Sequence, residues 1–269
     1  MFRHTSAFYD LVYREKDYAS ESRAIRAVVE ERVRAPEVRL LDVACGTGAH
    51  LAHLREAYAV EGIELDEGML GVARRRLPNV PLHHGDMMDF ELPRRFDTIT
   101  CLFSSIGYVR SLPKLRQAVR IWTKHLAPGG ILIVEPWIFP ESFRDGHVAA
   151  DLVTGDGITV ARVGTSEVIE DGRVSVLHMQ YLIASADGIR HEVERHELAL
   201  FSRHEYAAAF GACGLDVEFE VHGLTGRGLF IATGRPRRLA RTVYWKGTPY
   251  CVTRSDRHPA APRVAQRAS

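Results

Sequence analysis

Three patterns are missing from this 269-residue sequence, and each absence excludes a class of protein. The four cysteines lie far apart with no Cys-x-x-Cys pair, so we expect neither a zinc knot nor a disulfide framework, as suits a reducing cytoplasm. No apolar run approaches the length of a membrane span, and the opening residues MFRHTSAFYD lack the apolar stretch of a secretion signal. We therefore expect a soluble cytoplasmic protein with no membrane partner.

Acidic side chains are scarce in one segment only. Residues 235–269 carry nine Lys or Arg residues against one acid, Asp256, which leaves 26 basic and 33 acidic side chains in the first 234 residues. An acidic body argues against a nucleic-acid partner. We predict that the basic segment is a tail, mobile for most of its length, in which only the stretch TVYWKGTPY docks.

Apolar strand-like runs alternate with helical patterns over the first half of the chain. The pattern predicts a helix at 17–34 and then strands at 38–44, 59–64, near Leu82, at 96–103 and at 130–135, with helices at 49–57, 67–77 and 113–126 among them. Strands that alternate with helices form a parallel sheet with helices on both faces. The predicted fold class is therefore α/β.

The pattern changes after Pro136. Residues 157–201 contain three strand-like runs separated by Glu-Asp-Gly and Ala-Asp-Gly turns, which predict an inserted antiparallel β meander. A helix at 203–212 and strands around 215–221 and 228–233 then return to the main sheet. We expect residues 1–136 and 201–234 to form the core, 137–200 an inserted substrate-binding subdomain and 235–269 the tail. The meander also offers an edge for a homodimer.

The stretch LLDVACGTGAH, residues 40–50, predicts a buried strand, a glycine turn and a helix. Parallel sheets bind ligands at the carboxyl ends of their strands, and the first strand ends in this turn. Gly46 and Gly48 let the backbone approach a ligand and leave the amides of the next helix free. A dinucleotide site would have a third glycine where this chain has Leu51, so a nicotinamide cofactor is disfavoured.

Two further strand ends carry acids. Glu64 ends the second strand, where a carboxylate can accept both hydroxyls of a ribose. Asp86 and Met87 end the third strand, where a carboxylate and an amide can bind adenine. Each feature alone has a simpler explanation: a turn can be only a turn, a terminal acid is usually solvated, and Asp86 can cap a local turn. Their occurrence at three successive strand ends favours an adenosine-containing ligand.

These motifs resemble those of a known family. LLDVACGTG, EGIELDEGML and HHGDMMDF look like the class I S-adenosylmethionine methyltransferases, whose first motif corresponds to residues 42–48. FYDLVYREKDY, FSSIGYV, IVEPWIFPESF and TGRGLF resemble, more narrowly, the N,N-dimethyltransferases of dTDP-linked aminodeoxysugars in desosamine and mycaminose biosynthesis. The similarity covers about residues 8–234. It implies a Rossmann-like methyltransferase sheet, S-adenosylmethionine as cofactor and a dTDP-aminohexose as partner.

The resemblance also implies site residues. Tyr9 and Tyr18 would cover the cofactor, Glu64 would hold its ribose, and Leu102 would lend a carbonyl. The full cofactor-binding set is Tyr9, Tyr18, Asp42, Ala44, Gly46, Gly48, Glu64, Leu65, Met69, Asp86, Met87 and Leu102. The family's active-site His or Tyr after FSSIG corresponds to Tyr108. A substrate-facing tyrosine expected before FYD is absent, and this chain offers only Phe2 there.

The acceptor half has weaker signals. Arg162 and Arg227 match basic residues that suit a diphosphate, because arginine meets phosphate with two parallel hydrogen bonds. Trp137 follows a central strand, and its ring can pack against the sugar or the base of the substrate. The alternatives are a surface arginine for either residue and plain core packing for Trp137. The small residues Ser104, Ser105 and Gly107 would leave room for a second methyl group.

Methyl transfer to an amine is an in-line displacement, so we expect the alignment of nitrogen, carbon and sulfur to contribute most of the catalysis. Tyr108, His83 or a water would take the proton of the amine. Which amino sugar is used, at C3 or C4, and whether one or two methyls are added stay open. An O- or C-methyltransferase and a non-catalytic binding protein are the alternatives. HEVERHE, residues 191–197, resembles a zinc motif, but its histidines are five apart and point to opposite faces of a strand. No metal is expected.

Overall fold

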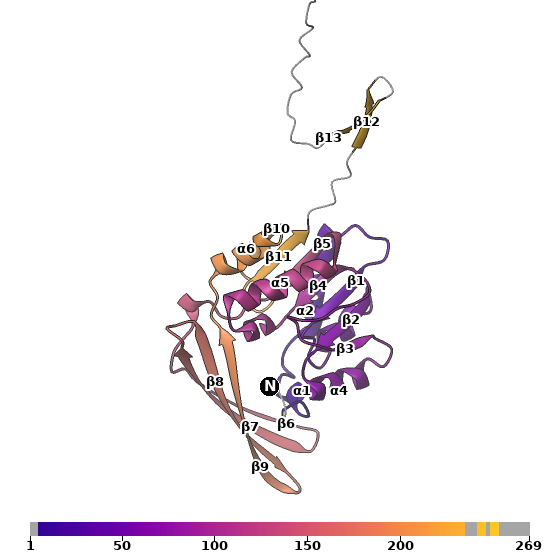
Figure 1. The fold of residues 1–269 in the computed structure, drawn as a ribbon. Helices are drawn as coiled ribbons and strands as arrows, with labels where there is room; N and C mark the ends of the chain where they lie inside the picture. The colour runs from indigo at the N-terminus through magenta and orange to yellow at the C-terminus, as the bar shows by residue number, and fades with distance from the viewer. Residues whose placement is uncertain (1–4, 235–240, 246–247, 253–269) are drawn as a thin grey trace, which may run out of the picture. The chain divides into compact units, whose positions relative to one another are not determined.

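The computed structural model describes residues 5–234, 241–245 and 248–252 (Figure 1). The chain divides into two units, Met1–Arg235 and Pro236–Ser269. Within the described part of the second unit, β12 (Arg241–Trp245) and β13 (Thr248–Val252) form an antiparallel pair. The predicted mobile stretches at 235–240 and 253–269, and Phe2, lie outside the described residues. No helix in the described ranges is both long and apolar enough to cross a membrane.

The first unit contains a seven-stranded sheet with the order β10-β11-β5-β4-β1-β2-β3. Its strands are β1 (Arg39–Val43), β2 (Ala59–Glu64), β3 (Leu82–His84), β4 (Phe96–Cys101), β5 (Leu126–Val134), β10 (Leu215–Glu220) and β11 (Leu229–Gly234). The first five pair in parallel, and β11 runs antiparallel to β5 and β10. The chain order reverses where β4 pairs with β1, and parallel sheets bind their ligands at such a point.

Helices cover both faces of this sheet, which confirms the predicted α/β class (Figure 1). Along β5, Ile131 and Ile133 pack in a cluster with α2 (Tyr18–Arg32) and α3 (Ala49–Leu54). Leu132 and Val134 point the other way, into a cluster with α5 (Leu112–His125) and α6 (Arg203–Ala212). The remaining helices of the unit are α1 (Tyr9–Val12), α4 (Glu67–Arg76), η1 (Ser105–Val109) and η2 (Pro140–Ser142).

The insertion is an antiparallel meander of four strands: β6 (Val148–Gly155), β7 (Ile158–Ile169), β8 (Val174–Ser185) and β9 (Gly188–Ala199). The three strand-like runs predicted within residues 157–201 are confirmed as β7, β8 and β9, and the structure adds β6, a mostly exposed edge strand with a weak apolar pattern. The β6–β7 turn contains Asp156 and Gly157, both at positive φ. An Asp-Gly pair of this kind is the usual signal of a tight hairpin and predicts the missing strand.

The two faces of the meander have different surroundings. In its pairing register Leu152, Ala161, Leu182 and His191 lie opposite one another and share the outer face. All of the strongly exposed large apolar residues of the meander lie on this face, and we call them the outer apolar patch: Val148, Leu152, Val163, Leu182, Ile189 and Val193. The patch exposes apolar side chains to water on this side of the sheet, beside polar ones such as Glu167 and His178.

The inner face of the meander packs against the N-terminal segment. Phe8 and Leu11 form a small buried cluster with Val160, Tyr181 and Ile183. The inner face also carries Arg162, Glu194 and His196, because their positions alternate with those of the outer face. Arg162, Glu194 and His196 therefore lie on the face of the meander that packs against the N-terminal segment.

Candidate functional site

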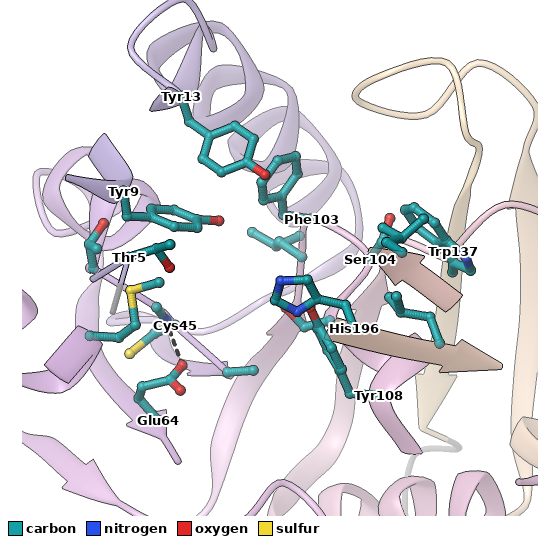
Figure 2. Close-up of a pocket in the computed structure, with 18 of the residues that line it drawn as sticks. Thr5, Tyr9, Tyr13, Cys45, Glu64, Phe103, Ser104, Tyr108, Trp137 and His196 are labelled. Carbon is teal, nitrogen blue, oxygen red and sulfur yellow. Dashed lines mark hydrogen bonds between the residues drawn. The ribbon is translucent and has the colours of Figure 1, made fainter. Parts of the chain in front are cut away.

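A cavity of about 470 Å³ lies at the carboxyl ends of β1, β2 and β4. Its wall is completed by the α1 segment and by the inner face of β7, β8 and β9. Its volume falls within the range of about 300–1,000 Å³ found for small-molecule sites. Figure 2 shows Glu64, Tyr9 and Thr5 on one side, Trp137 and Ser104 on the other, and Tyr108 with His196 between them.

The glycine turn after β1 uses its two glycines differently. Gly46 (φ 58°) lines the cavity, and a Cβ there would meet nothing within 4 Å, so the backbone is open to a ligand. Gly48 (φ 75°) does not line it. A Cβ on Gly48 would lie 2.8 Å from Leu77 and 3.3 Å from Ala73, so this glycine lets α3 start close to α4. Gly48 shapes the turn and is placed away from the ligand space.

Glu64 is buried at the end of β2 and lines the cavity. Its carboxylate accepts hydrogen bonds from the amides of Gly46 and Asp66, both at 2.8 Å. Burial raises the pKa of Glu64, and these backbone donors partly offset the rise. A carboxylate offers about four acceptor sites, so Glu64 can brace the glycine turn and still accept hydroxyl donors from a ligand.

Asp42 lines the cavity beneath the turn and accepts a 2.7 Å hydrogen bond from Thr100. Full burial raises its pKa to about 6, against the lowering effects of His50 and of the Thr100 hydroxyl. The ionised form is therefore disfavoured in the folded chain.

We expect Asp42→Asn to stabilise the fold at neutral pH by up to about 3 kcal/mol. A carboxyl whose folded pKa is raised costs nothing when both states are protonated, and its cost grows as pH rises through the unfolded and then the folded pKa, here about 6. Asparagine keeps an acceptor for Thr100 without the charge. Urea unfolding at about pH 5 and about pH 8 measures this, and an equal gain at both would contradict a charge effect.

Asp86 and Met87 come directly after β3, and both line the cavity. One oxygen of Asp86 accepts from the amide of Met88 at 2.8 Å, so the residue also braces a local turn. The carbonyl of Met87 accepts from the indole of Trp122 at 2.9 Å, which fixes this turn to α5. Leu102, buried after β4, closes the same end of the cavity.

The N-terminal segment is bound to the glycine turn. Thr47, within the turn, donates to Asp10 of α1 at 2.7 Å. Arg76 of α4 donates to the same carboxylate at 2.6 Å and to the carbonyl of Thr47 at 2.6 Å. Tyr9 and Tyr18 line the cavity beside these contacts. No sequence pattern pointed to this clamp, because its three members come from distant segments.

The turn after β4 has an unusual backbone. Phe103 (φ 51°) and Ser104 (φ 64°) both lie in the left-handed region, which is costly for residues other than glycine and is often found at functional sites. The fully buried Glu135 accepts from the amide of Phe103 at 2.7 Å and from the hydroxyl of Thr225. Ser104 donates to the carbonyl of Pro136 at 2.8 Å. These bonds hold the strained turn in place.

One of the three small residues expected to leave room for a second methyl group lies outside the cavity wall. A Cβ on Gly107 would lie 3.0 Å from Leu198 and 3.1 Å from Trp137, and Gly107 is not part of the cavity wall. Its small size allows close packing of η1. Ser104 and Ser105 do line the cavity.

The two arginines predicted to bind the acceptor differ in their partners. Arg227 donates to the hydroxyl of Ser104 at 3.1 Å, and its guanidinium lies over the ring of Trp137 at 5.4 Å. Arg162 is paired with Asp151, with an Nε–Oδ2 distance of 2.9 Å, and lies over the ring of Tyr13. Arg227 meets a neutral acceptor, so its charge is the more available of the two for an anion.

Tyr108 lines the cavity from η1, and its hydroxyl lies 3.0 Å from Nδ1 of His196. His196 and its neighbour Glu194 are the functional-looking residues that sequence reasoning missed, because HEVERHE was weighed only as a metal motif. Its alternation does place the two side chains on one face. His83, named as a possible proton acceptor, lies outside the cavity wall and pairs with Glu61 at 2.9 Å.

Among the described residues, every predicted binding residue except Gly48 lines this one cavity. The residues predicted for the cofactor and those predicted for the acceptor therefore line one common space, although they are spread from residue 9 to residue 227.

Comparison with known proteins agrees with this geometry. Residues 40–130 match the family described as "Methyltransferase domain". The dTDP-3-amino-3,6-dideoxy-alpha-D-glucopyranose N,N-dimethyltransferase of Streptomyces fradiae is 48% identical over 87% of this chain and 91% of its own length. A dTDP-4-amino-2,3,4,6-tetradeoxy-D-glucose N,N-dimethyltransferase of Saccharopolyspora spinosa is 41% identical over 83% of this chain and 90% of its own.

Solved structures give the same result. The Streptomyces venezuelae protein DesVI superposes with a TM-score of 0.80 and 45% identity, covering 85% of this chain and 98% of that one. CalS10, an amino pentose methyltransferase of Micromonospora echinaspora solved with bound S-adenosylmethionine, superposes with a TM-score of 0.76 and 44% identity. The match covers 84% of this chain and 95% of that one. With this identity over nearly the whole length of these relatives, the chain belongs to the dTDP-amino-sugar N,N-dimethyltransferases, a family of S-adenosylmethionine-dependent methyltransferases.

Proposed function

We propose that this protein transfers methyl groups from S-adenosylmethionine to the amino group of a dTDP-linked aminodeoxyhexose in natural-product biosynthesis, and that two transfers complete the reaction. The observation that carries the proposal is the single cavity that joins Glu64 and the glycine turn to Trp137 and Arg227. We place the reaction in the cytoplasm, since Cys45, Cys101 and Cys213 are free thiols, as expected in a reducing compartment.

The cofactor half fits S-adenosylmethionine on the donor set it presents. Glu64 supplies acceptors for the ribose hydroxyls, and the open backbone at Gly46 leaves space for the chain beyond the ribose. Asp86 and Met87 supply an acceptor and an amide for adenine. When bound, the cofactor supplies a methyl group on a positively charged sulfur, which is already activated for displacement. The rings of Tyr9 and Tyr18 exclude water from that side.

The acceptor half suits a nucleotide sugar. Arg227, and Arg162 with it, would meet the diphosphate, and Trp137 would support the sugar or the base. Most of the other lining residues on this side come from the meander, so we propose residues 137–200 as the substrate-binding subdomain attached to a core of 1–136 and 201–234. Catalysis then consists mainly of holding the amine in line with the methyl group.

Incubation with S-adenosylmethionine and a panel of dTDP-3-amino and dTDP-4-aminohexoses, followed by mass spectrometry, tests this function. Gain of one and then two methyl groups is the expected result, and NMR of the product locates them on nitrogen. A methyl group on oxygen or carbon would establish the alternative reaction. Cofactor binding without mass gain on any acceptor would contradict an enzymatic role in amino-sugar methylation.

We also propose that the protein is a homodimer joined through the outer apolar patch, rather than through an edge of the meander as the sequence suggested. The six side chains of the patch are uncharged and about half or more exposed. Two copies related by a two-fold axis place such a face against itself. Sheets pack face to face in this way in β-sandwiches. The dimer contact would make the meander more rigid by covering its outer face, which lies opposite the face that lines the cavity.

We expect Leu182→Glu to convert a dimer into a monomer, because a carboxylate at the centre of the buried patch would lose its hydration. Analytical ultracentrifugation of the wild type and the variant measures this. Val221→Glu is the matched control, since Val221 is similarly exposed but comes after β10, outside the patch. A wild-type monomer, or a dimer that survives Leu182→Glu, would rule out this interface.

A further inference from the structure

Four polar side chains form a continuous row that ends in the cavity. Thr5 donates to Glu194 at 2.8 Å, Glu194 lies 3.2 Å from Nε2 of His196, and Nδ1 of His196 lies 3.0 Å from the hydroxyl of Tyr108. Glu194 and His196 are two residues apart on the inner face of β9, and both are about 95% buried. Figure 2 shows His196 and Tyr108 side by side at the cavity wall.

The partners of the two ring nitrogens assign the proton positions. A carboxylate only accepts hydrogen bonds, so Nε2 of His196 carries the proton that faces Glu194. Nδ1 of the neutral ring is then a lone pair, and the Tyr108 hydroxyl donates to it. The row is therefore oriented: a proton that arrives at Tyr108 can pass to His196, where Glu194 stabilises the resulting charge.

Tyr108 cannot take a proton for itself. Burial raises its pKa well above the usual value, and Tyr13, Glu194, Tyr181 and Glu64 raise it further. Its hydroxyl thus stays protonated at neutral pH, and it can accept a proton only while giving its own away. The base must be a group behind it.

The other titratable neighbours do not replace His196 in this role. Tyr9 and Tyr13 face Tyr108 from the α1 segment, and Tyr181 faces it from β8 with Arg162 beside it. Burial raises the pKa of Tyr9 and of Tyr181, so both phenols keep their protons, and Arg162 is a permanent cation. Glu64 is bonded to the backbone of the glycine turn.

We propose that His196 accepts, through Tyr108, the proton that the sugar ammonium group must lose before each methyl transfer, and that Glu194 positions His196. This rests on the proposed function. The substrate ammonium gives a proton to the Tyr108 oxygen while the Tyr108 proton moves to Nδ1 of His196, which leaves a neutral amine, a neutral tyrosine and an imidazolium paired with Glu194. Tyr108 is the catalytic residue, and His196 and Glu194 act through it.

The dependence of kcat on pH tests the relay. We expect Tyr108→Phe and His196→Gln each to lower kcat about 10²-fold, at the lower end of what general-base catalysis contributes, with a smaller change in KM. The rise of kcat with pH should move to higher pH in both variants, because the amine must then lose its proton to solvent. Glu194→Gln should move the rise of kcat with pH by a smaller amount than either of these variants. Added imidazole should restore part of the rate of His196→Ala.

His191→Ala is the matched control, since His191 lies on the outer face of the same strand and is exposed. It should leave the pH profile unchanged. Wild-type-like circular dichroism and thermal melting of Tyr108→Phe, which keeps the ring, separate loss of the relay from loss of fold.

A second readout needs no turnover. In ¹⁵N-histidine-labelled wild-type protein, the His196 resonances should show a protonated Nε2 and an unprotonated Nδ1, and Glu194→Gln should change this balance. If the wild type methylates no amino sugar, the proposed function fails while the NMR result still stands. If the wild type is active and kcat of Tyr108→Phe and of His196→Gln rises at the same pH as in the wild type, the relay is wrong. It is also wrong if Nδ1 of His196 carries the proton.

Discussion

Glu64→Ala is expected to weaken the binding of S-adenosylmethionine by about 10- to 150-fold, which corresponds to the roughly 1.5–3 kcal/mol of charge-assisted hydrogen bonds. The loss has two sources. The ribose hydroxyls lose a charged acceptor, and the amides of Gly46 and Asp66 lose the oxygens to which they now donate at 2.8 Å. The glycine turn would then no longer be fixed at the distance a ligand needs. Isothermal titration calorimetry with the cofactor and with its demethylated product measures the change.

Glu64→Gln separates the two sources. Glutamine keeps one acceptor oxygen for the turn but loses the charge, so we expect a smaller loss of affinity than for alanine. Glu67→Ala is the control, since Glu67 is an exposed acid only three residues away at the start of α4. Unchanged cofactor affinity in Glu64→Ala would remove the basis for an adenosine ligand at this end of the cavity.

Arg227→Ala is expected to raise KM for the nucleotide sugar by about 10- to 150-fold and to leave cofactor affinity unchanged. Arg227 meets the neutral hydroxyl of Ser104 and two ring faces, so its charge can be given fully to a diphosphate. Arg227→Lys should recover only part of the loss, because an ammonium lacks the planar pair of donors.

Arg162→Ala should raise KM less than Arg227→Ala. Arg162 already forms an ion pair with Asp151, so its removal should lower the affinity for the substrate less. The removal also leaves the Asp151 carboxylate unpaired at the surface. Arg190→Ala is the control, because Arg190 is an exposed arginine of β9 that does not line the cavity. Steady-state kinetics at saturating cofactor give the comparison. Equal effects from all three arginines would indicate general charge attraction instead of a diphosphate site.

Much of the fold can be predicted from local patterns in the sequence. The strand bounds of β2 and the helix bounds of α6 are those expected, because apolar alternation, the capping residues Ser202 and Glu205 and nearby glycines mark them. The position of Glu64 and Asp86 in the cavity wall could be predicted in the same way, since both lie at the carboxyl ends of parallel strands, where ligands bind. β6 was missed because an exposed edge strand buries little and so has no strong pattern.

Contacts between distant segments could not be predicted in this way. The Tyr108–His196 pair joins residues 88 positions apart, and Thr5 and Glu194 are 189 apart. Periodicity states which residues share a face, but only the packing of the meander against the sheet decides which face meets Tyr108. The role of Gly107 was misjudged for the same reason, because its neighbours Leu198 and Trp137 are remote in sequence.

The two proposals together give strand β9 two unrelated tasks, one on its even-numbered residues and one on its odd-numbered residues. Even-numbered positions such as Glu194 and His196 lie on the inner face, and odd-numbered ones such as His191 and Val193 lie on the outer face. A substitution therefore disturbs one task and spares the other, so that assembly and turnover can drift independently during evolution. A one-residue deletion early in the strand has no such selectivity: it exchanges the two sets of side chains and abolishes both tasks together.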